Sequence, residues 1–268
     1  MNTTAQQVRR HPAVQVLGRI GMVFYGAVHI LIAWLAVQVV IGDSAQADSK
    51  GALAQISQTT MGPVLLWALT IGLFFFAIWQ LTEAAMGFTY VSEKRKRLGK
   101  RIGAGARAIT GVAIGIGALQ FAQGAGSTDS TGKQQALTAK VLALPFGQVL
   151  VGAVAVGILV IAVIIFRKGV KRSFEQDLDM STLPNGSRRW VERTGRIGWM
   201  GKGVAYGVIG ILVGLAAINA NAEESGGMDK ALHTVAAQSY GMVLLSLIAL
   251  GLAAFGVYCF AAAKAHRE

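Results

Sequence analysis

Apolar stretches long enough to cross a membrane occur six times in this chain of 268 residues. A hydrocarbon core of roughly 30 Å requires roughly 20 helical residues. Each stretch must be helical, because a segment in lipid has to satisfy its own backbone hydrogen bonds. The sequence therefore predicts an all-α integral membrane protein with six transmembrane helices. The predicted spans are Val16–Ile41, Gly62–Phe88, Ile102–Phe121, Phe146–Phe166, Ile197–Ile218 and Gly241–Ala263.

The charges between these spans are distributed unevenly. The chain is 53% apolar and 14% charged, yet it has a formal charge of +12. The N-terminal segment, the two connections after spans two and four, and the C-terminal tail lie on one side. With the adjoining span ends they carry 21 Lys or Arg and 7 acids, a net +14, against 4 Lys and 6 acids, a net −2, in segments 42–61, 124–145 and 219–240. The positive-inside rule predicts that the basic side is cytoplasmic, with both termini there.

The N-terminal span could be mistaken for a cleaved signal peptide. Arg9 and Arg10 precede it, and Ala45-Gln46-Ala47 after it resembles a cleavage site. However, its apolar run covers 26 residues, whereas the apolar region of a signal peptide spans roughly 7–15. We therefore expect a retained span. Cys259 is the only cysteine, which excludes an intrachain disulfide and a thiolate metal cluster.

An internal repeat is visible three times. Arg-Ile-Gly opens spans one, three and five at residues 19–21, 101–103 and 196–198. Two spans per repeat make all three repeats enter the membrane in the same orientation, as parallel repeats. We expect one membrane domain built of units 1–97, 98–187 and 188–268, either as a pseudo-threefold ring or packed less regularly. The later landmarks are Ala52-Leu53, Ala136-Leu137 and Ala231-Leu232, then Gly62, Gly147 and Gly241 with a leucine three residues on, then Gly72, Gly157 and Gly251.

The opening of each repeat carries a family resemblance. Gly18-Arg19-Ile20-Gly21 and Gly195-Arg196-Ile197-Gly198 share a Gly-Arg-x-Gly pattern, and the second unit, Gly99-Lys100-Arg101-Ile102-Gly103, has one extra residue. With the later Ala-Leu, Gly and Leu landmarks, this pattern resembles the bacterial membrane family called domain of unknown function 1206. The resemblance covers essentially the whole chain. It implies the topology and no assigned activity, so it implies no catalytic residue.

The repeated arginines Arg19, Arg101 and Arg196 are the first candidate binding residues. Clustered at one end of a common axis, they would contact an anion or a phospholipid headgroup, because guanidinium groups suit phosphate. The alternative, which we favour, is that each is an ordinary anchor that extends its charge to the membrane interface.

Charged residues also enter the spans. Six residues beyond the repeated arginines stand Tyr25, Arg107 and Lys202, and Glu83 is the only acid within any span. An intramembrane charge usually needs a partner. We therefore expect an ion pair of Glu83 with Arg107 or Lys202, in a structural role.

A polar seam along the axis is a further hypothesis, with His29, Gln38 and Gln120 as candidates. Gln38 and Gln120 share a repeat position, but the third repeat has Leu215 there, and His29 is not repeated. These residues therefore give no seam shared by all three repeats. A lone membrane histidine is more often hydrogen-bonded to a neighbouring helix than bound to metal.

Metal and cofactor sites are weakly indicated. Glu175 with Asp179, and Asp229 with His233, are four residues apart, a spacing that places two ligands on one helix face. Both pairs lie in loops without an evident third ligand, so solvated polar residues are the favoured interpretation. We predict no catalytic residue, cofactor or metal. A glycine-rich phosphate loop would need a strand before it, so nucleotide binding is disfavoured, and no nucleic-acid partner is expected.

The loops contain shorter patterned segments. Residues 52–61, 136–144 and 231–239 predict interfacial helices that cap the bundle or lie flat on the membrane. Phe174, Leu178 and Met180 precede a Pro-Asn-Gly turn in the long basic connection, where a docking segment and a plain linker are both open. Glycines four apart predict close helix packing, namely Gly99 and Gly103, Gly111 and Gly115, Gly203 and Gly207, and Gly210 and Gly214.

Four classes of function are compatible with this pattern. The parallel repeat favours a passive conduit or a small-solute or ion transport-type protein. The glycine-rich faces favour a non-catalytic accessory or assembly component of a larger membrane complex, with membrane-protein partners. A lipid- or quinone-binding protein is third, and an intramembrane enzyme last. In every case anionic phospholipids are expected at the basic face.

Overall fold

The computed structural model describes residues 12–43, 45–88, 91–182 and 186–265, and its regular elements there are helices. Six of these helices are long and apolar enough to cross a membrane. Three shorter α-helices and three 3-10 turns lie in the connections. The long helices are α2 (Pro12–Val40), α4 (Gly62–Met86), α5 (Lys94–Ala122), α7 (Gly147–Val170), α8 (Ser187–Ile218) and α10 (Gly241–Ala265).

Two of the long helices begin well before the starts that hydropathy predicts. α5 begins at Lys94 and α8 at Ser187, roughly two to three turns before the predicted starts at Ile102 and Ile197. Lys and Arg are good helix formers, so the helix continues through the basic residues beyond the part that lipid surrounds. Hydropathy detects only that part, which is why these extensions were missed.

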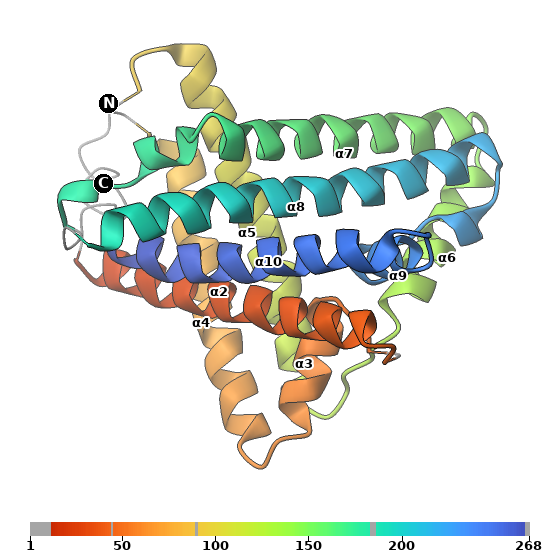
Figure 1. Ribbon diagram of the computed structural model, residues 1–268, viewed down its shortest axis with the longest axis horizontal. Helices are drawn as coiled ribbons and strands as arrows, with labels where there is room; N and C mark the ends of the chain where they lie inside the picture. Colours follow the sequence, from red (N-terminus) through yellow and green to blue (C-terminus); the bar gives the residue numbers. More distant parts are fainter. Residues whose placement is uncertain (1–11, 44, 89–90, 183–185, 266–268) are drawn as a thin grey trace.

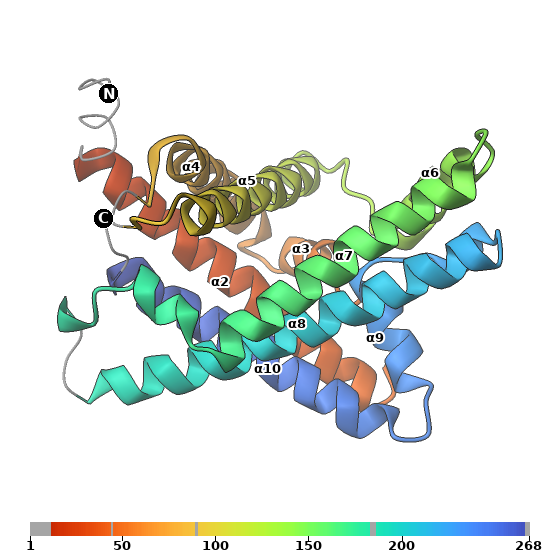
Figure 2. The ribbon, with the colours of Figure 1, turned by 90° about the horizontal axis from the view of Figure 1, so that it is seen from above.

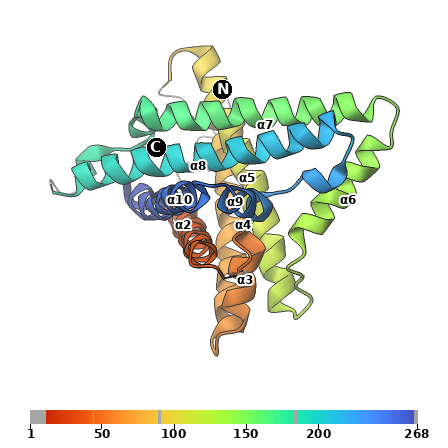
Figure 3. The ribbon, with the colours of Figure 1, turned by 45° about the vertical axis from the view of Figure 1, so that its right-hand side comes forward.

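The helices pack mainly between repeats. The second helix of each repeat lies against the first helix of another, giving the pairs α4 with α5, α7 with α8, and α10 with α2. In Figure 1, α4 and α5 run steeply across the other four helices. Figure 3, where α2 and α10 are seen nearly end-on, shows that each of the three pairs has its own direction. Three helix pairs that are related by a pseudo-threefold axis cross one another steeply when each pair is strongly tilted from that axis.

The second repeat departs from this symmetry. α2 packs against α4 and α8 against α10, but α5 and α7 share no comparable interface, and Figure 2 shows them separated for much of their length. Phe76 and Phe255 occupy one repeat position and are 0% and 2% exposed, whereas Ile161 at the same position in α7 is 46% exposed. The ring of six helices is therefore open on one side, between α5 and α7.

The short helices α3 (Ser49–Ser57), α6 (Ser130–Leu142) and α9 (Met228–Ala236) occupy the acidic face. They confirm that the predicted segments are helical, but each begins three to six residues earlier. Asp48 and Asp129 explain two of these starts, because their carboxylates accept hydrogen bonds from Gly51 N (2.9 Å) and Gly132 N (2.8 Å). Such N-caps satisfy backbone donors that the first turn leaves free.

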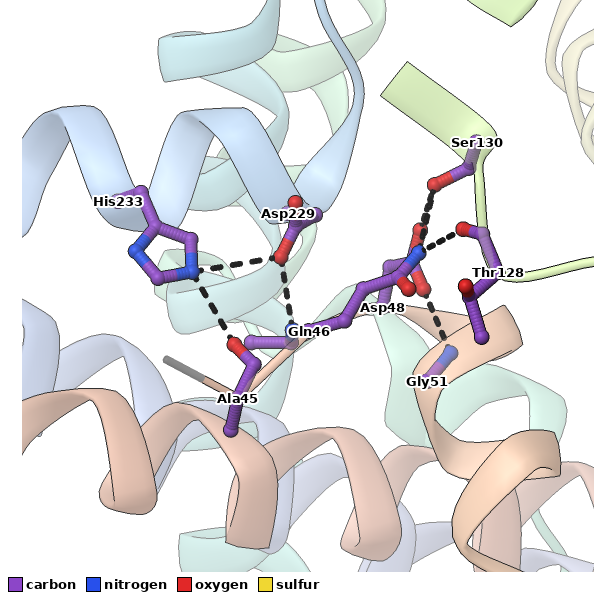
Figure 4. Close-up of polar contacts among 9 residues, drawn as sticks. Ala45, Gln46, Asp48, Gly51, Thr128, Ser130, Asp229 and His233 are labelled. Carbon is purple, nitrogen blue, oxygen red and sulfur yellow. Dashed lines mark hydrogen bonds and ion pairs between the residues drawn. The ribbon is translucent and has the colours of Figure 1, made fainter. Parts of the chain in front are cut away.

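A polar cluster joins the three repeats at this face (Figure 4). Gln46 Nε2 donates to the Thr128 carbonyl and to Ser130 Oγ, and Ser130 Oγ donates to Asp48. Ala47 N donates to Asp229 Oδ1 at 2.9 Å. In the same cluster His233 Nε2 lies 3.1 Å from the Ala45 carbonyl and 3.5 Å from Asp229. Asp229 and His233, whose spacing matches a metal-binding motif, therefore hold α9 against the connection after α2 through these contacts.

An Asp48→Ala variant is expected to destabilise the protein by about 2 kcal/mol, because it removes an N-cap and the buried partner of Ser130. Asp129→Ala is the matched control, since Asp129 is also an N-cap and its carboxylate bonds only Gly132 N among the described contacts. Its loss should cost about 1 kcal/mol. Thermal unfolding of the detergent-solubilised protein measures both. Equal losses in the two variants would contradict a role for Asp48 in joining the repeats.

The basic connection after α7 folds back under the bundle. The 3-10 turn η1 (Ser173–Asp177) carries Phe174, which is 0% exposed and packs edge-on against Tyr258 with ring centroids 5.3 Å apart. Leu178 is also buried, and Asp179 N donates to the Ala265 carbonyl at 2.6 Å. Of the two interpretations left open, the docking segment is therefore correct. It ends in a second 3-10 turn, η2 (Met180–Thr182).

Candidate functional site

A cavity of about 50 Å³ lies where the three helix pairs meet. A water needs roughly 10–15 Å³ measured in this way, so the cavity holds a few waters or one small solute. Its walls come from all six long helices and from η1 and the adjoining loops. The lining residues are Met22, Tyr25, Phe76, Gln80, Phe88, Arg107, Lys168, Asp177, Leu178, Trp199, Phe255, Tyr258, Cys259 and Ala262.

The three residues six positions beyond the repeated arginines converge at this cavity. Tyr25 and Arg107 line it. Lys202 lies directly behind Tyr25 and donates from Nζ to the Tyr25 hydroxyl at 2.9 Å. Its ammonium also lies 4.1 Å from the centroid of the Phe255 ring. The three repeats therefore bring one repeat position to the same cavity and place two cations in or beside it.

The polar neighbours of these cations are neutral. Lys202 Nζ lies 3.3 Å from His29 Nε2, and His29 Nδ1 lies 2.8 Å from the Tyr25 carbonyl. Arg107 Nε donates to Gln80 Oε1 at 3.2 Å. A charged group inside a membrane protein whose hydrogen-bond partners are neutral has a high desolvation cost. Such a group therefore identifies a candidate functional site.

Two further cations share one carboxylate at the basic end of the cavity. Lys100 Nζ lies 2.7 Å from Asp177 Oδ1, and Lys168 Nζ lies 2.9 Å from Asp177 Oδ2. The Lys168 ammonium also lies 4.2 Å from the centroid of the Trp199 ring. The Asp177 carboxylate thus joins α5, α7 and η1 across the opening between α5 and α7.

The pKa of Asp177 reflects this bridge. Burial of the carboxyl group alone would raise its pKa, but the two ammonium groups of Lys168 and Lys100 hold the pKa well below the ordinary value. A depressed folded-state pKa stabilises the fold above the ordinary carboxyl pKa, and this contribution is lost as the pH falls. Asp177 is therefore a carboxylate at neutral pH, and the bridge is ionic.

The interior beyond the cavity is closed toward the acidic face. One helical turn further along α2, α4 and α10 stand Val28, Leu73 and Leu252, each 0% exposed. Leu69 and Ile248 continue this packing as part of the same apolar core. The cavity therefore ends inside the bundle, and the axis is not an open pore in this state.

No contact in the described part of the chain joins one repeated arginine to another. Arg19 and Arg196 are exposed. Arg101 Nε donates to the Gly87 carbonyl at the end of α4, 3.3 Å away, and the Arg196 backbone lies against Gly169 at the end of α7. Arg101 and Arg196 thus lie at two different seams between repeats, where a cation also favours the C-terminal end of the neighbouring helix. Their contact with lipid headgroups stays a prediction.

The other candidates are dispersed. Glu83 is buried one turn from Gln80 and does not line the cavity, while Arg107 and Lys202 bond Gln80 and Tyr25. The ion pair expected for Glu83 stays a prediction. Of the three seam candidates, His29 joins the Lys202 cluster, Gln38 is half-buried and Gln120 is exposed. No hydrogen bond in the described part of the chain links these three residues.

Sequence reasoning missed the second half of the site, Lys168 and Asp177. A signal for Lys168 exists, because it and Glu83 both stand 21 residues after the repeat glycines Gly147 and Gly62. No such signal exists for Asp177, because it lies in a connection without a repeated counterpart. Only the docking of η1 brings it to the cavity.

Comparison with known proteins places the chain in a family. The family model described as Domain of Unknown Function (DUF1206) matches three times, at residues 20–87, 102–172 and 197–266. A Bacillus subtilis (strain 168) protein described as uncharacterized protein YxxB is 34% identical over 247 residues, which cover 92% of this chain and 89% of that protein. No solved structure matches the chain. The chain is therefore a six-helix membrane protein that belongs to the DUF1206 family, one family unit for each repeat.

Proposed function

We propose that the protein is a transport-type membrane protein for a small anion, without enzymatic activity, oriented with its basic face toward the cytoplasm. The observation that carries this proposal is the charge at the central cavity. Arg107 and Lys168 line it, with Lys202 behind Tyr25, whereas Asp177 is the only acid that lines it among the described residues. An excess of fixed positive charge inside the membrane favours an anion.

The closed acidic side supports a gated carrier over a passive pore. The cavity ends at Val28, Leu73 and Leu252, so passage requires these side chains to separate. The three helix pairs provide a means, because each is a packed unit that can move against the other two, as in other carriers that rock one bundle against another. The orientation is supported by the positive-inside rule, which also favours anionic phospholipids at the basic face.

Osmotic swelling of proteoliposomes in potassium salts, with a potassium ionophore present, tests this proposal. The probes are chloride, nitrate, formate and phosphate. We expect swelling above protein-free vesicles for at least one of them, and Arg107→Gln should reduce that rate about tenfold, since one buried cation contact to an anion is worth roughly 1.4 kcal/mol or more. Arg95→Gln, on the exposed start of the same helix, should leave the rate unchanged.

Two results would overturn the proposal. Vesicles that swell no faster than protein-free ones for all four anions would favour an accessory or assembly role. Swelling that is equally fast in wild-type and Arg107→Gln protein would place the anion route elsewhere. Each variant is first checked for wild-type elution and thermal unfolding in detergent.

A further inference from the structure

We propose that Lys100, Lys168 and Arg107 form a binding site for a small carboxylate, and that Asp177 is the chain's own occupant of this site, displaced when a solute carboxylate binds. This inference names the substrate class of the anion route and rests on that proposed function. It begins from the geometry of the bridge between α5, α7 and η1.

Asp177 is held as a bound carboxylate would be. Its two oxygens each contact a different ammonium group, Oδ1 with Lys100 at 2.7 Å and Oδ2 with Lys168 at 2.9 Å. Charge-assisted hydrogen bonds of this length are the strong ones. Trp199, whose ring centroid lies 4.2 Å from the Lys168 ammonium, forms an apolar wall beside the pair. A free carboxylate in place of the Asp177 side chain would meet the same two cations.

The cavity supplies room beside this position. Asp177, Lys168 and Arg107 all line it, and its volume of about 50 Å³ suits a carboxylate of one or two carbons. Arg107 has five N–H donors in a fork that matches a carboxylate, and Nε is the one that bonds Gln80. A solute entering from the basic face therefore meets Asp177 first and Arg107 next.

Exchange of one carboxylate for another keeps the lysines paired. Removing a buried charge from its partner leaves the partner uncompensated, which is the largest cost of breaking a buried ion pair. A solute carboxylate avoids this cost for the two lysines because it replaces Asp177 on both ammonium groups. The displaced Asp177 carboxylate must in turn reach water at the basic face. The backbone of η1 can stay docked meanwhile, since Phe174 and the Asp179–Ala265 hydrogen bond hold it independently. An uncharged solute or chloride would not reproduce the two-point contact.

Calorimetric titration of the detergent-solubilised full chain with sodium formate tests the inference. We expect Asp177→Asn to bind formate about tenfold more tightly than the wild type, because the competing carboxylate is gone, which corresponds to about 1.4 kcal/mol. Asp179→Asn is the matched control, two residues along the same segment, and should bind as the wild type does. Chloride at equal ionic strength should not compete. An Asp177→Asn affinity equal to that of the wild type would overturn the inference.

A second comparison covers the case in which Asp177→Asn fails to fold. In an otherwise wild-type chain, Arg107→Gln should weaken formate binding about tenfold, since it removes a cation offered to the solute without removing Lys100 or Lys168, the partners of Asp177. Arg95→Gln, exposed at the start of the same helix, should not. Unchanged formate binding in Arg107→Gln would overturn the site. Binding and flux are measured separately, so the two proposals can fail independently. Formate binding without any anion flux would support the carboxylate site and overturn the transport proposal.

Discussion

A Gly251→Val variant is expected to lose the folded six-helix bundle, whereas Gly157→Val keeps wild-type stability within about 0.5 kcal/mol. A Cβ atom at Gly251 would lie 2.6 Å from Gly201 Cα, so the backbones of α8 and α10 are in contact there. Overpacking costs ~1–3 kcal/mol when side chains can adjust, and more when two backbones must separate. Gly157 occupies the same repeat position in α7, and no neighbouring atom lies within 4 Å of its Cβ position.

Thermal unfolding and size-exclusion chromatography in one detergent compare the two variants. Gly157→Val is a closely matched control, because the substitution and the repeat position are the same and only the surroundings of the glycine differ. An unfolding midpoint of Gly251→Val equal to that of the wild type would contradict the close contact of α8 with α10. Strong destabilisation by Gly157→Val would contradict the exposed position of α7.

A Phe174→Ala variant is expected to release η1 from the bundle. Truncation of a fully buried phenylalanine costs ~3–5 kcal/mol, and Phe174 is 0% exposed against Tyr258 and Gly195. Because the segment docks through few contacts, we expect this loss to appear as local opening rather than global unfolding. The Asp177 bridge to Lys100 and Lys168 would then open as well.

Hydrogen exchange of the detergent-solubilised protein measures this opening. Amides of residues 173–179 should exchange faster by about two orders of magnitude or more, since each 1.4 kcal/mol of local stability is a factor of ten, while α4 and α10 keep their protection. Trp190→Ala is the control, because Trp190 is 70% exposed on the neighbouring helix α8. Unchanged exchange at η1 in Phe174→Ala would show that the segment is held by other contacts.

Hydropathy and repetition predicted the helices well because both depend on local composition. A helix in lipid must be apolar along its length, so Gly62–Met86 and Gly241–Ala265 could be placed to within a few residues. Helix ends beyond the lipid, such as Lys94–Arg101, carry no such constraint. The N-caps Asp48 and Asp129 were readable signals for the starts of α3 and α6.

Glycine packing was predicted less accurately. Gly203 and Gly210 pack against Phe166 and Leu159, but no neighbour lies within 4 Å of the Cβ positions of Gly99 and Gly207. A close backbone approach instead uses Gly201 and Gly251, from different helices. Spacing along one helix identifies a small-residue face, but not the helix that this face meets. That choice depends on which repeats pair with each other.

The candidate site likewise has one part that the sequence pattern predicts and one part that it does not. The convergence of Tyr25, Arg107 and Lys202 follows from their common repeat position once the repeats surround one axis. The bridge of Asp177 to Lys100 and Lys168 does not, because it joins segments 77 and 9 residues apart without a repeated pattern. Cavities and ion pairs arise from side chains of several helices, so no single stretch of sequence encodes them.

By itself, the sequence determined the six helices, the three parallel repeats and the separation of charge between two faces. The reason is that a segment surrounded by lipid must be apolar along its length, so its position can be read from local composition. Only the tertiary structure decided that the repeats pair with one another more closely than within themselves, that the ring is open between α5 and α7, and that η1 docks at its basic end. These features depend on contacts between distant segments. Gly251 and Gly157 illustrate the difference, since one repeat position is packed against a neighbouring backbone in α10 and exposed in α7.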